Sequence, residues 1–150
     1  MIQQAFKYFF LERPASKKDV SQWITSFAES GEAIQKKTLS AADSESNRKV
    51  LSHIIGIERW GNRRLEVALG EPFIQDEYNN YRPPRDASWE QLQTDFADTR
   101  NETTQLLQKI KESNIELSKM IAHNQYGDIS LKGWMRYLVM HANLESKRLR

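Results

Sequence analysis

Two histidines and a glutamate fall on helical stripes that the sequence otherwise fills with apolar residues. His53 lies three residues after Val50 and four before Ile57, at the edge of a stripe that must face a core. His141 occupies a similar stripe near the carboxy end, and Glu145 follows it by four residues on the same helix face. Because an ionised carboxylate on a buried stripe is costly unless it is paired, Glu145 requires a partner.

A divalent metal ion is one partner that suits all three side chains. Neutral imidazoles offer nitrogen lone pairs, the carboxylate offsets part of the cation's charge, and the remaining positions stay open for water or substrate. The sequence contains no cysteine, which excludes disulfides, thiolate ligands and a cysteine nucleophile. The resulting hypothesis is one divalent ion held by His53, His141 and Glu145.

Spacing alone leaves metal-free alternatives open for the same residues. His141 and Glu145 can form an i,i+4 hydrogen-bonded pair near the carboxy end, and His53 can be satisfied by a backbone carbonyl. The third histidine, His123, lies where the helical period fails, which indicates a loop residue. Ser52 forms no catalytic triad with its neighbour, because adjacent residues of a helix point apart.

The elements that must position these side chains are helices, since apolar residues recur at helical spacing along most of the chain. Residues before Pro14 can form a short helix that is joined to the next by a kink. The longer predicted helices are 16–34, capped by Ser16; about 47–69, capped by Ser44 or Ser46; 88–110, opened by Ser88; and about 130–150.

Two stretches interrupt this pattern. Residues 71–87 are polar and contain the pair Pro83-Pro84, which is too irregular for a strand and too rich in proline for a helix. Between 112 and 129 the helical period fails, and residues 120–122 followed by a turn at 124–127 predict a short extended segment. We therefore predict a single all-α domain over 1–150, a four-helix bundle with an irregular or short extended segment between its last two helices.

Other polar and aromatic residues on these helices have structural interpretations. Glu58 follows His53 by five residues and points off the metal line, which suits either support of a metal ligand or helix packing. Trp60 and Trp134 have the spacing of core residues. Three arginines are interrupted by acidic residues and are expected on a solvated charged face: Arg59, Arg63 and Arg64.

The composition and charge of the chain argue against nucleic acid and membranes as its partners. Hydrophobic residues make up 39% of the chain and charged residues 28%, a balance typical of a soluble globular protein. The formal net charge of +2 gives no reason to expect nucleic acid, and the basic residues 147–150 suit a solvated helix end. No apolar run approaches the roughly 20 residues that span a bilayer. The first residues, MIQQAFKYFFLERP, lack the basic region and cleavage site of a signal peptide, so we expect a cytoplasmic protein with no membrane partner.

Two segments of the sequence resemble a known family. Residues 51–70, LSHIIGIERWGNRRLEVALG, resemble the second helix of the DinB/YfiT-like superfamily, in which a histidine is followed closely by a glutamate and an aromatic residue. Residues 133–150, GWMRYLVMHANLESKRLR, resemble its last helix, where a Trp-Leu/Met-x-x-Leu-x-x-His pattern leads to a second ligand one turn later. The resemblance covers most of the chain and implies the four-helix bundle of that superfamily.

The resemblance also implies a ligand set. Members hold one divalent ion, often zinc or nickel, on one histidine of the second helix and two of an H-x-x-x-H in the last. His53 matches the first position and His141 the second, whereas Glu145 stands where the family has a third histidine. A carboxylate at that position shifts the preference toward Mn, Fe or Ni relative to three imidazoles.

Two functions follow as expectations. Characterised relatives include thiol S-transferases that use bacillithiol, mycothiol or glutathione, which implies a metal-dependent transferase acting with a small thiol on an electrophilic small molecule. Metal-assisted hydrolysis would use the same site. The alternative is a catalytically inactive interaction module that has lost the metal, with the aromatic residues Phe6, Phe9 and Phe10 as a docking surface. A homodimer is expected under both.

Overall fold

The computed structural model describes residues 2–150, and it is mostly helical, as the sequence predicts. The short extended segment predicted between the last two helices is confirmed as an antiparallel pair of strands, in which Met120 pairs with Ser130 and His123 with Gly127. The elements are α1 (Ile2–Phe6), the π-helical turn η1 (Lys7–Glu12), α2 (Arg13–Ala15), α3 (Val20–Ser40), α4 (Glu45–Ala68), the 3-10 turn η2 (Tyr78–Tyr81), α5 (Trp89–Glu112), β1 (Met120–His123), β2 (Gly127–Ser130) and α6 (Leu131–Ser146).

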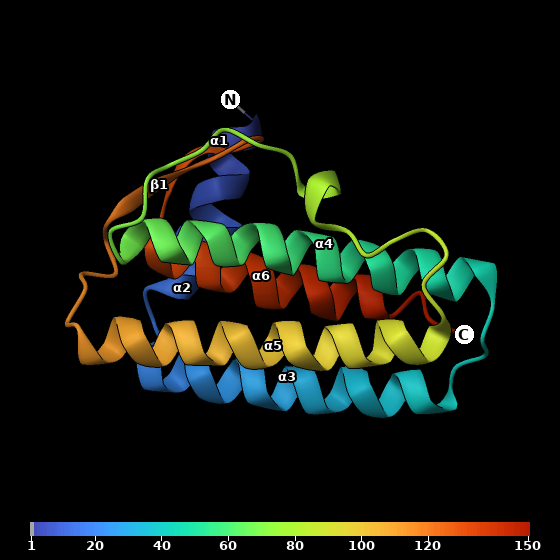
Figure 1. Cartoon of the computed structure of the whole chain (residues 1–150). Helices are drawn as coiled ribbons and strands as arrows, with labels where there is room; N and C mark the ends of the chain where they lie inside the picture. The colour runs from blue at the N-terminus through green and yellow to red at the C-terminus, as the bar shows by residue number, and fades with distance from the viewer. Residues whose placement is uncertain (1) are drawn as a thin grey trace.

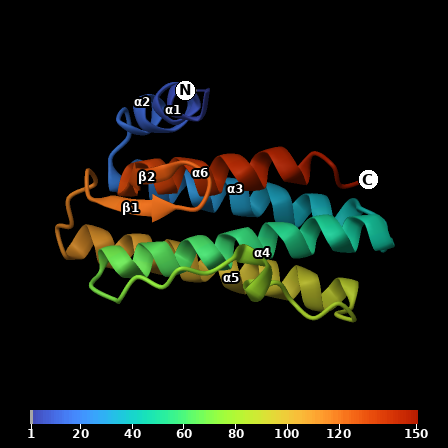
Figure 2. The ribbon, with the colours of Figure 1, turned by 90° about the horizontal axis from the view of Figure 1, so that it is seen from above.

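The long helices α3, α4, α5 and α6 lie side by side along their lengths (Figure 1). Helix α4 packs against α5 and α6, and α3 packs against the same two helices. The amino-terminal helical turns and the pair of strands lie at one end of this arrangement, as the view from above shows (Figure 2). The packing of α4 on α6 brings together two segments that are far apart in the sequence.

The starts of the long helices follow from capping chemistry. Asp19, not Ser16, caps α3: its side chain accepts a hydrogen bond from the Gln22 amide, and the Gln22 side chain accepts one from the Asp19 amide. The prediction of Ser16 as the cap was wrong, because this hydroxyl donates to the Arg13 carbonyl instead. Ser44 and Ser88 cap α4 and α5 as predicted.

The amino-terminal segment packs across the end of α6. Pro14 lies within its helical turns, so the predicted break comes later, at residues 16–19. Phe9 and Phe10 are more than half exposed, whereas Phe6 is partly buried and stacks on Tyr126. The expectation of an exposed ring was therefore wrong for Phe6. Among residues 2–150, no helix has the length and apolar character needed to cross a bilayer.

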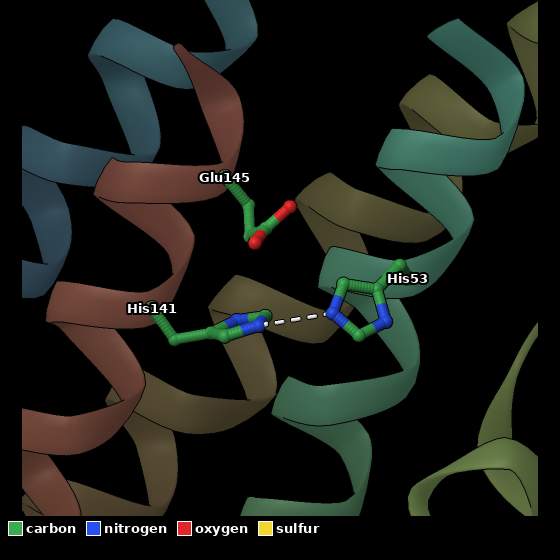
Figure 3. Close-up of side chains that lie close together, drawn as sticks. All are labelled: His53, His141 and Glu145. Atoms are coloured by element: carbon green, nitrogen blue, oxygen red, sulfur yellow. Dashed lines mark hydrogen bonds between the residues drawn. The ribbon is translucent and has the colours of Figure 1, made fainter. Parts of the chain in front are cut away.

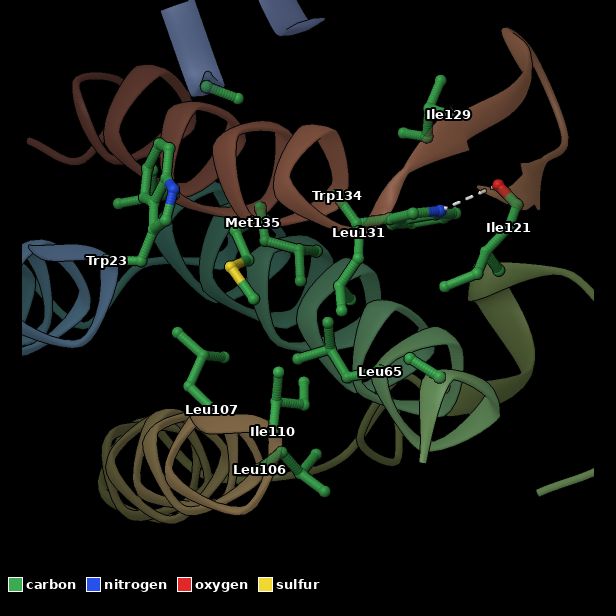
Figure 4. Close-up of a cluster of buried hydrophobic side chains, with 14 of the residues drawn as sticks. Trp23, Leu65, Leu106, Leu107, Ile110, Ile121, Ile129, Leu131, Trp134 and Met135 are labelled. Carbon is green, nitrogen blue, oxygen red and sulfur yellow. Dashed lines mark hydrogen bonds between the residues drawn. The ribbon is translucent and has the colours of Figure 1, made fainter. Parts of the chain in front are cut away.

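The apolar core lies between the long helices and extends to the strands. Trp60 and Trp134 are buried in it, as predicted, with ring centroids 5.2 Å apart. The Trp134 indole N–H donates to the Ile121 carbonyl at 3.1 Å, which fixes α6 to β1. Figure 4 labels the core residues Trp23, Leu65, Leu106, Leu107, Ile110, Ile121, Ile129, Leu131, Trp134 and Met135.

A buried ion pair interrupts the core between α4 and α5. Arg100 donates to both carboxylate oxygens of Glu58 at 2.8–3.1 Å and to the Phe27 carbonyl at 2.9 Å. Thr103 donates to the same carboxylate at 2.9 Å. Gly31 of α3 makes room for the arginine, since a Cβ there would lie 2.9 Å from Arg100 Cγ. The predicted role of Glu58 in helix packing is confirmed.

The predicted solvated face of α4 was wrong for one of its arginines. Arg64 is 1% exposed and pairs with Asp76 at 3.0 Å. The connection between α4 and α5 folds back over α4, and the Trp60 indole and the Tyr81 hydroxyl also donate to Asp76. Arg59 and Arg63 remain partly exposed. A partly buried carboxylate in the irregular connection after α4, which helical spacing does not reveal, accounts for the difference.

Candidate metal centre

The three side chains that the sequence singles out lie close together where α4 packs against α6 (Figure 3). His53 extends from α4, and His141 and Glu145 extend from successive turns near the end of α6. Each side chain offers one ligand atom, and these atoms all lie within 4.8 Å of one another. The side chains are partly buried, so the cluster could hold a metal ion with room for a further ligand.

The separation of the two imidazoles fits a shared ion. The Nε2 atoms of His53 and His141 are 3.1 Å apart, and the ring planes make an angle of 63°. Two nitrogens that each lie about 2.1 Å from one ion stand about 3.0 Å apart in octahedral coordination and about 3.4 Å apart in tetrahedral coordination. The same separation also allows one imidazole to donate a hydrogen bond to the other.

The surroundings keep both imidazoles neutral. The pKa of His141 is lowered to about 4, chiefly by burial and also by the nearby His53, while Glu145 opposes the shift. Burial also lowers the pKa of His53, with Glu145 again opposing and the charges of Arg82 and Arg148 adding to the effect. A neutral imidazole retains the lone pair that a metal ion requires.

Glu145 faces the histidines because the residues after α6 are held in place. Helix α6 ends at Ser146 rather than continuing to residue 150 as predicted, and Leu149 in the following turn is only 3% exposed. Asn47, in the first turn of α4, accepts a hydrogen bond from the Arg150 amide and donates to the Arg150 carbonyl. This Asn47 clamp keeps the last turn of α6 against α4.

The Glu145 carboxylate forms an ion pair with Arg148. Arg148 donates to Glu145 at 2.9 Å from the following turn, with a side chain that is 66% exposed. The basic residues at the carboxy end were expected to be solvated, and Arg148 is mostly so while still contacting Glu145. An exposed ion pair of this kind contributes little free energy, so it leaves the carboxylate available to a ligand.

Two tyrosines flank the cluster. The ring of Tyr78, in η2, meets His53 edge-on with centroids 5.3 Å apart. The ring of Tyr137 lies one turn before His141 on α6, with centroids 6.0 Å apart. Burial raises the pKa of Tyr137, which therefore keeps its proton at neutral pH. Sequence analysis missed both, because Tyr78 lies in an irregular connection and a tyrosine at helical spacing resembles core.

His123 was predicted to lie in a loop, and this prediction was wrong. It is the last residue of β1 and is only 5% exposed. Its Nδ1 accepts hydrogen bonds from the amides of Gln125 and Tyr126, and its ring packs against Trp60 and Trp134. The strand pairing turns it into the core, which the helical period could not reveal. It takes no part in the cluster of the other two histidines.

No family model matches the chain, and no curated protein or solved structure has a significant match to it.

Proposed function

We propose that this protein binds one divalent metal ion through His53, His141 and Glu145. The observation that carries the proposal is the 3.1 Å separation of the two histidine Nε2 atoms, with a carboxylate oxygen within 4.8 Å. Two neutral nitrogens and one anionic oxygen suit zinc, nickel, manganese or iron in the divalent state. The partial burial of all three side chains leaves coordination positions for a substrate.

The chemistry we propose is transfer of a small thiol to an electrophilic small molecule by a four-helix bundle of the DinB/YfiT-like kind. The support is the position of the ligands, with one on α4 and two four residues apart on α6, in the segments that resemble that superfamily. A divalent ion in this site would favour the thiolate form of a bound thiol at neutral pH, and thereby its attack on an electrophilic carbon.

The protein's own residues contribute position and charge. Burial keeps His53 and His141 neutral, and Glu145 supplies a negative charge that offsets that of the ion. The rings of Tyr78 and Tyr137 cover two sides of the histidine pair and exclude part of the solvent. These contacts orient the imidazoles before any ligand arrives, which lowers the entropy lost on binding.

Metal content tests the proposal directly. Protein purified without a chelator or a histidine tag should contain, or take up on reconstitution, one ion per chain. His141→Ala should weaken binding by more than about 100-fold and Glu145→Gln by about tenfold or more. The matched control is Leu144→Ala, which truncates an exposed side chain of the same turn and should bind metal normally.

Two results would contradict the proposal. One is a protein that stays below stoichiometric metal after reconstitution with each of the four ions. The other is equal binding by His141→Ala and Leu144→Ala. For the thiol, a cobalt-loaded protein should develop a thiolate charge-transfer band on addition of cysteine, and a spectrum that stays unchanged would overturn the transferase chemistry while leaving metal binding intact.

A metal-free interaction module is the second candidate. The observation that favours it is a surface of aromatic side chains on η1, since Tyr8, Phe9 and Phe10 are each 54–55% exposed. In this case one imidazole of the pair donates a hydrogen bond to the other. Sedimentation at several concentrations, combined with metal analysis, tests the module: a metal-loaded protein that stays monomeric throughout would contradict it, whereas a dimer is compatible with both candidates.

A further inference from the structure

A groove with basic walls lies between residues of the amino-terminal half of α4 and residues of the connection from α4 to α5. Figure 1 shows this connection passing along α4. Its volume is about 820 Å³, within the range of pockets that bind small molecules. The charged residues that line it are four cations and one carboxylate, namely Arg48, Lys49, Arg82, Arg85 and Glu45, and Ser52 and Pro83 line it beside them.

The positive charge of this groove is only partly compensated. Arg48 pairs with Asp43 at 2.8 Å, and Lys49 pairs with Glu45 at 3.1 Å. Over the part of the chain that the structure describes, the arginines at 82 and 85 have no carboxylate within ion-pair distance. Uncompensated guanidinium groups in a concave site favour an anionic ligand, above all one with the planar geometry of a carboxylate or the oxygens of a phosphate.

Arg82 is held in place before a ligand binds. Its Nε donates to Ser52 Oγ at 3.2 Å and its Nη2 to the Lys49 carbonyl at 3.3 Å. Gly56 allows the close approach, since a Cβ there would lie 2.6 Å from Arg82 Cγ and 3.3 Å from the Tyr78 carbonyl. The connection and α4 are therefore fitted together at this point, and the guanidinium is oriented along the groove wall.

The groove adjoins the candidate metal centre. Ser52, in its wall, immediately precedes His53, and Asn79, also in its wall, follows the tyrosine that meets His53 edge-on. Arg82 donates to Ser52, the residue before His53, so the cationic wall of the groove lies beside the segment of α4 that carries this histidine.

We infer that this groove binds the carboxylate or phosphate group of the small molecule that reaches the histidine pair. That this molecule is a substrate rests on the proposed metal function. The binding of an anion in the groove does not depend on the metal. The guanidinium groups of Arg82 and Arg85 supply the contacts, and Arg82 fixes the end of the ligand nearest to His53.

The test uses metal-free protein at constant ionic strength. Citrate and pyrophosphate are titrated separately while amide chemical shifts are followed, and the amides of Ser52, Asn79 and Ala87 should move with at least one of them. Arg82→Gln and Arg85→Gln should each weaken binding about tenfold. The matched control is Lys36→Gln, on the exposed face of α3, which should bind as the wild type does.

Selective binding of citrate identifies a carboxylate ligand and selective binding of pyrophosphate a phosphate ligand, and both support the inference. Unchanged amides with both anions would overturn it, as would equal affinity in Arg82→Gln and Lys36→Gln. Gly56→Ala gives a second route, since it displaces Arg82 without removing charge and should also weaken binding.

The failure of this inference can be told from the failure of the proposed function. His141→Ala, which lacks a metal ligand, should keep its affinity for the anion. Arg82→Gln, which lacks an anion contact, should still take up one metal ion. A protein that binds metal but neither anion contradicts the groove alone, and one that binds an anion but no metal contradicts the metal centre alone.

Discussion

Helix α4 carries two polar clusters about one and a half turns apart, and they differ in how their polar groups are satisfied. The Glu58 carboxylate accepts hydrogen bonds from Arg100 and Thr103, and both members of the ion pair are no more than 4% exposed. The carboxylate of Glu145 instead accepts from the mostly exposed Arg148, and its two histidine neighbours contact each other with neutral nitrogens.

The difference separates a structural cluster from a candidate binding site. Around Glu58, the carboxylate oxygens accept hydrogen bonds from Arg100 and Thr103 and the charges cancel, so an added ligand would find no unused charge. Around His53, nitrogen and oxygen lone pairs converge without a matching set of buried donors. We propose that a ligand completes the second cluster, and each of the following experiments bears on this contrast.

The largest expected effect is a loss of stability when the buried ion pair of Glu58 and Arg100 is broken. Glu58→Ala leaves the Arg100 guanidinium buried without its carboxylate, and should lower the free energy of unfolding by about 3–5 kcal/mol. The control is Glu102→Ala, which removes the exposed partner of Arg63 and should cost about 1 kcal/mol or less. Urea denaturation measures both, and equal losses would remove the basis of the comparison.

The burial of His123 in the core should make the stability of the protein depend on pH. Burial lowers the pKa of His123 from 6.5 to about 4, so below pH 6.5 the unfolded chain binds the proton more readily than the folded one. The free energy of unfolding should therefore fall as the pH drops from about 6.5 to about 4, by about 3 kcal/mol from this group. In His123→Asn, which keeps an acceptor for the turn amides but does not titrate, the pH dependence should be shallower by that amount. Parallel curves would show that this histidine titrates normally.

The stability of the protein should increase when metal binds to the cluster of His53, His141 and Glu145, and should change little when one of these side chains is replaced in the absence of metal. A divalent ion at 100 times its Kd should stabilise the protein by about 2.7 kcal/mol, measured as a rise in Tm. Metal-free His141→Leu should differ from the metal-free wild type by about 1 kcal/mol or less, because no closed hydrogen-bond network is lost. A loss as large as that of Glu58→Ala would place the histidine pair among the structural clusters.

The smallest expected effect concerns the exposed cation beside the site. Arg148→Gln removes the group that competes with a metal ion for the Glu145 carboxylate, so metal affinity should rise a few-fold, with less than about 1 kcal/mol change in stability. Calorimetric titration with zinc measures it, with Lys132→Gln at the other end of α6 as a control. Weaker binding in Arg148→Gln would mean that the arginine positions the carboxylate instead.

The sequence predicts the helices and the convergence of three ligands well, because both depend on local periodicity. His53 and His141 lie on apolar stripes, and stripes of neighbouring helices must face each other. The same reasoning fails for contacts made by irregular segments. Arg64 was expected in solvent, and only the path of the connection reveals its buried partner, Asp76. His123 depends in the same way on the register of two short strands.

The groove beside His53 was also beyond sequence analysis. Arg82 lies in a stretch that periodicity describes only as irregular, and its place over Gly56 results from how that stretch folds back on α4. The one signal was the pair Pro83-Pro84, which restricts the backbone that follows the arginine. A charged residue in such a stretch indicates a binding site only when the fold shows that it lines a concave surface.

The Asn47 clamp has a consequence for how quickly a ligand could leave. Terminal helical turns commonly open on their own at little cost in free energy. Here three hydrogen bonds to the Arg150 backbone, together with the buried Leu149, join the end of α6 to the start of α4 and the turn before it. Glu145 therefore belongs to the same cooperative unit as the first turn of α4. An ion held by Glu145 would therefore not be lost through fraying of the last turn of α6.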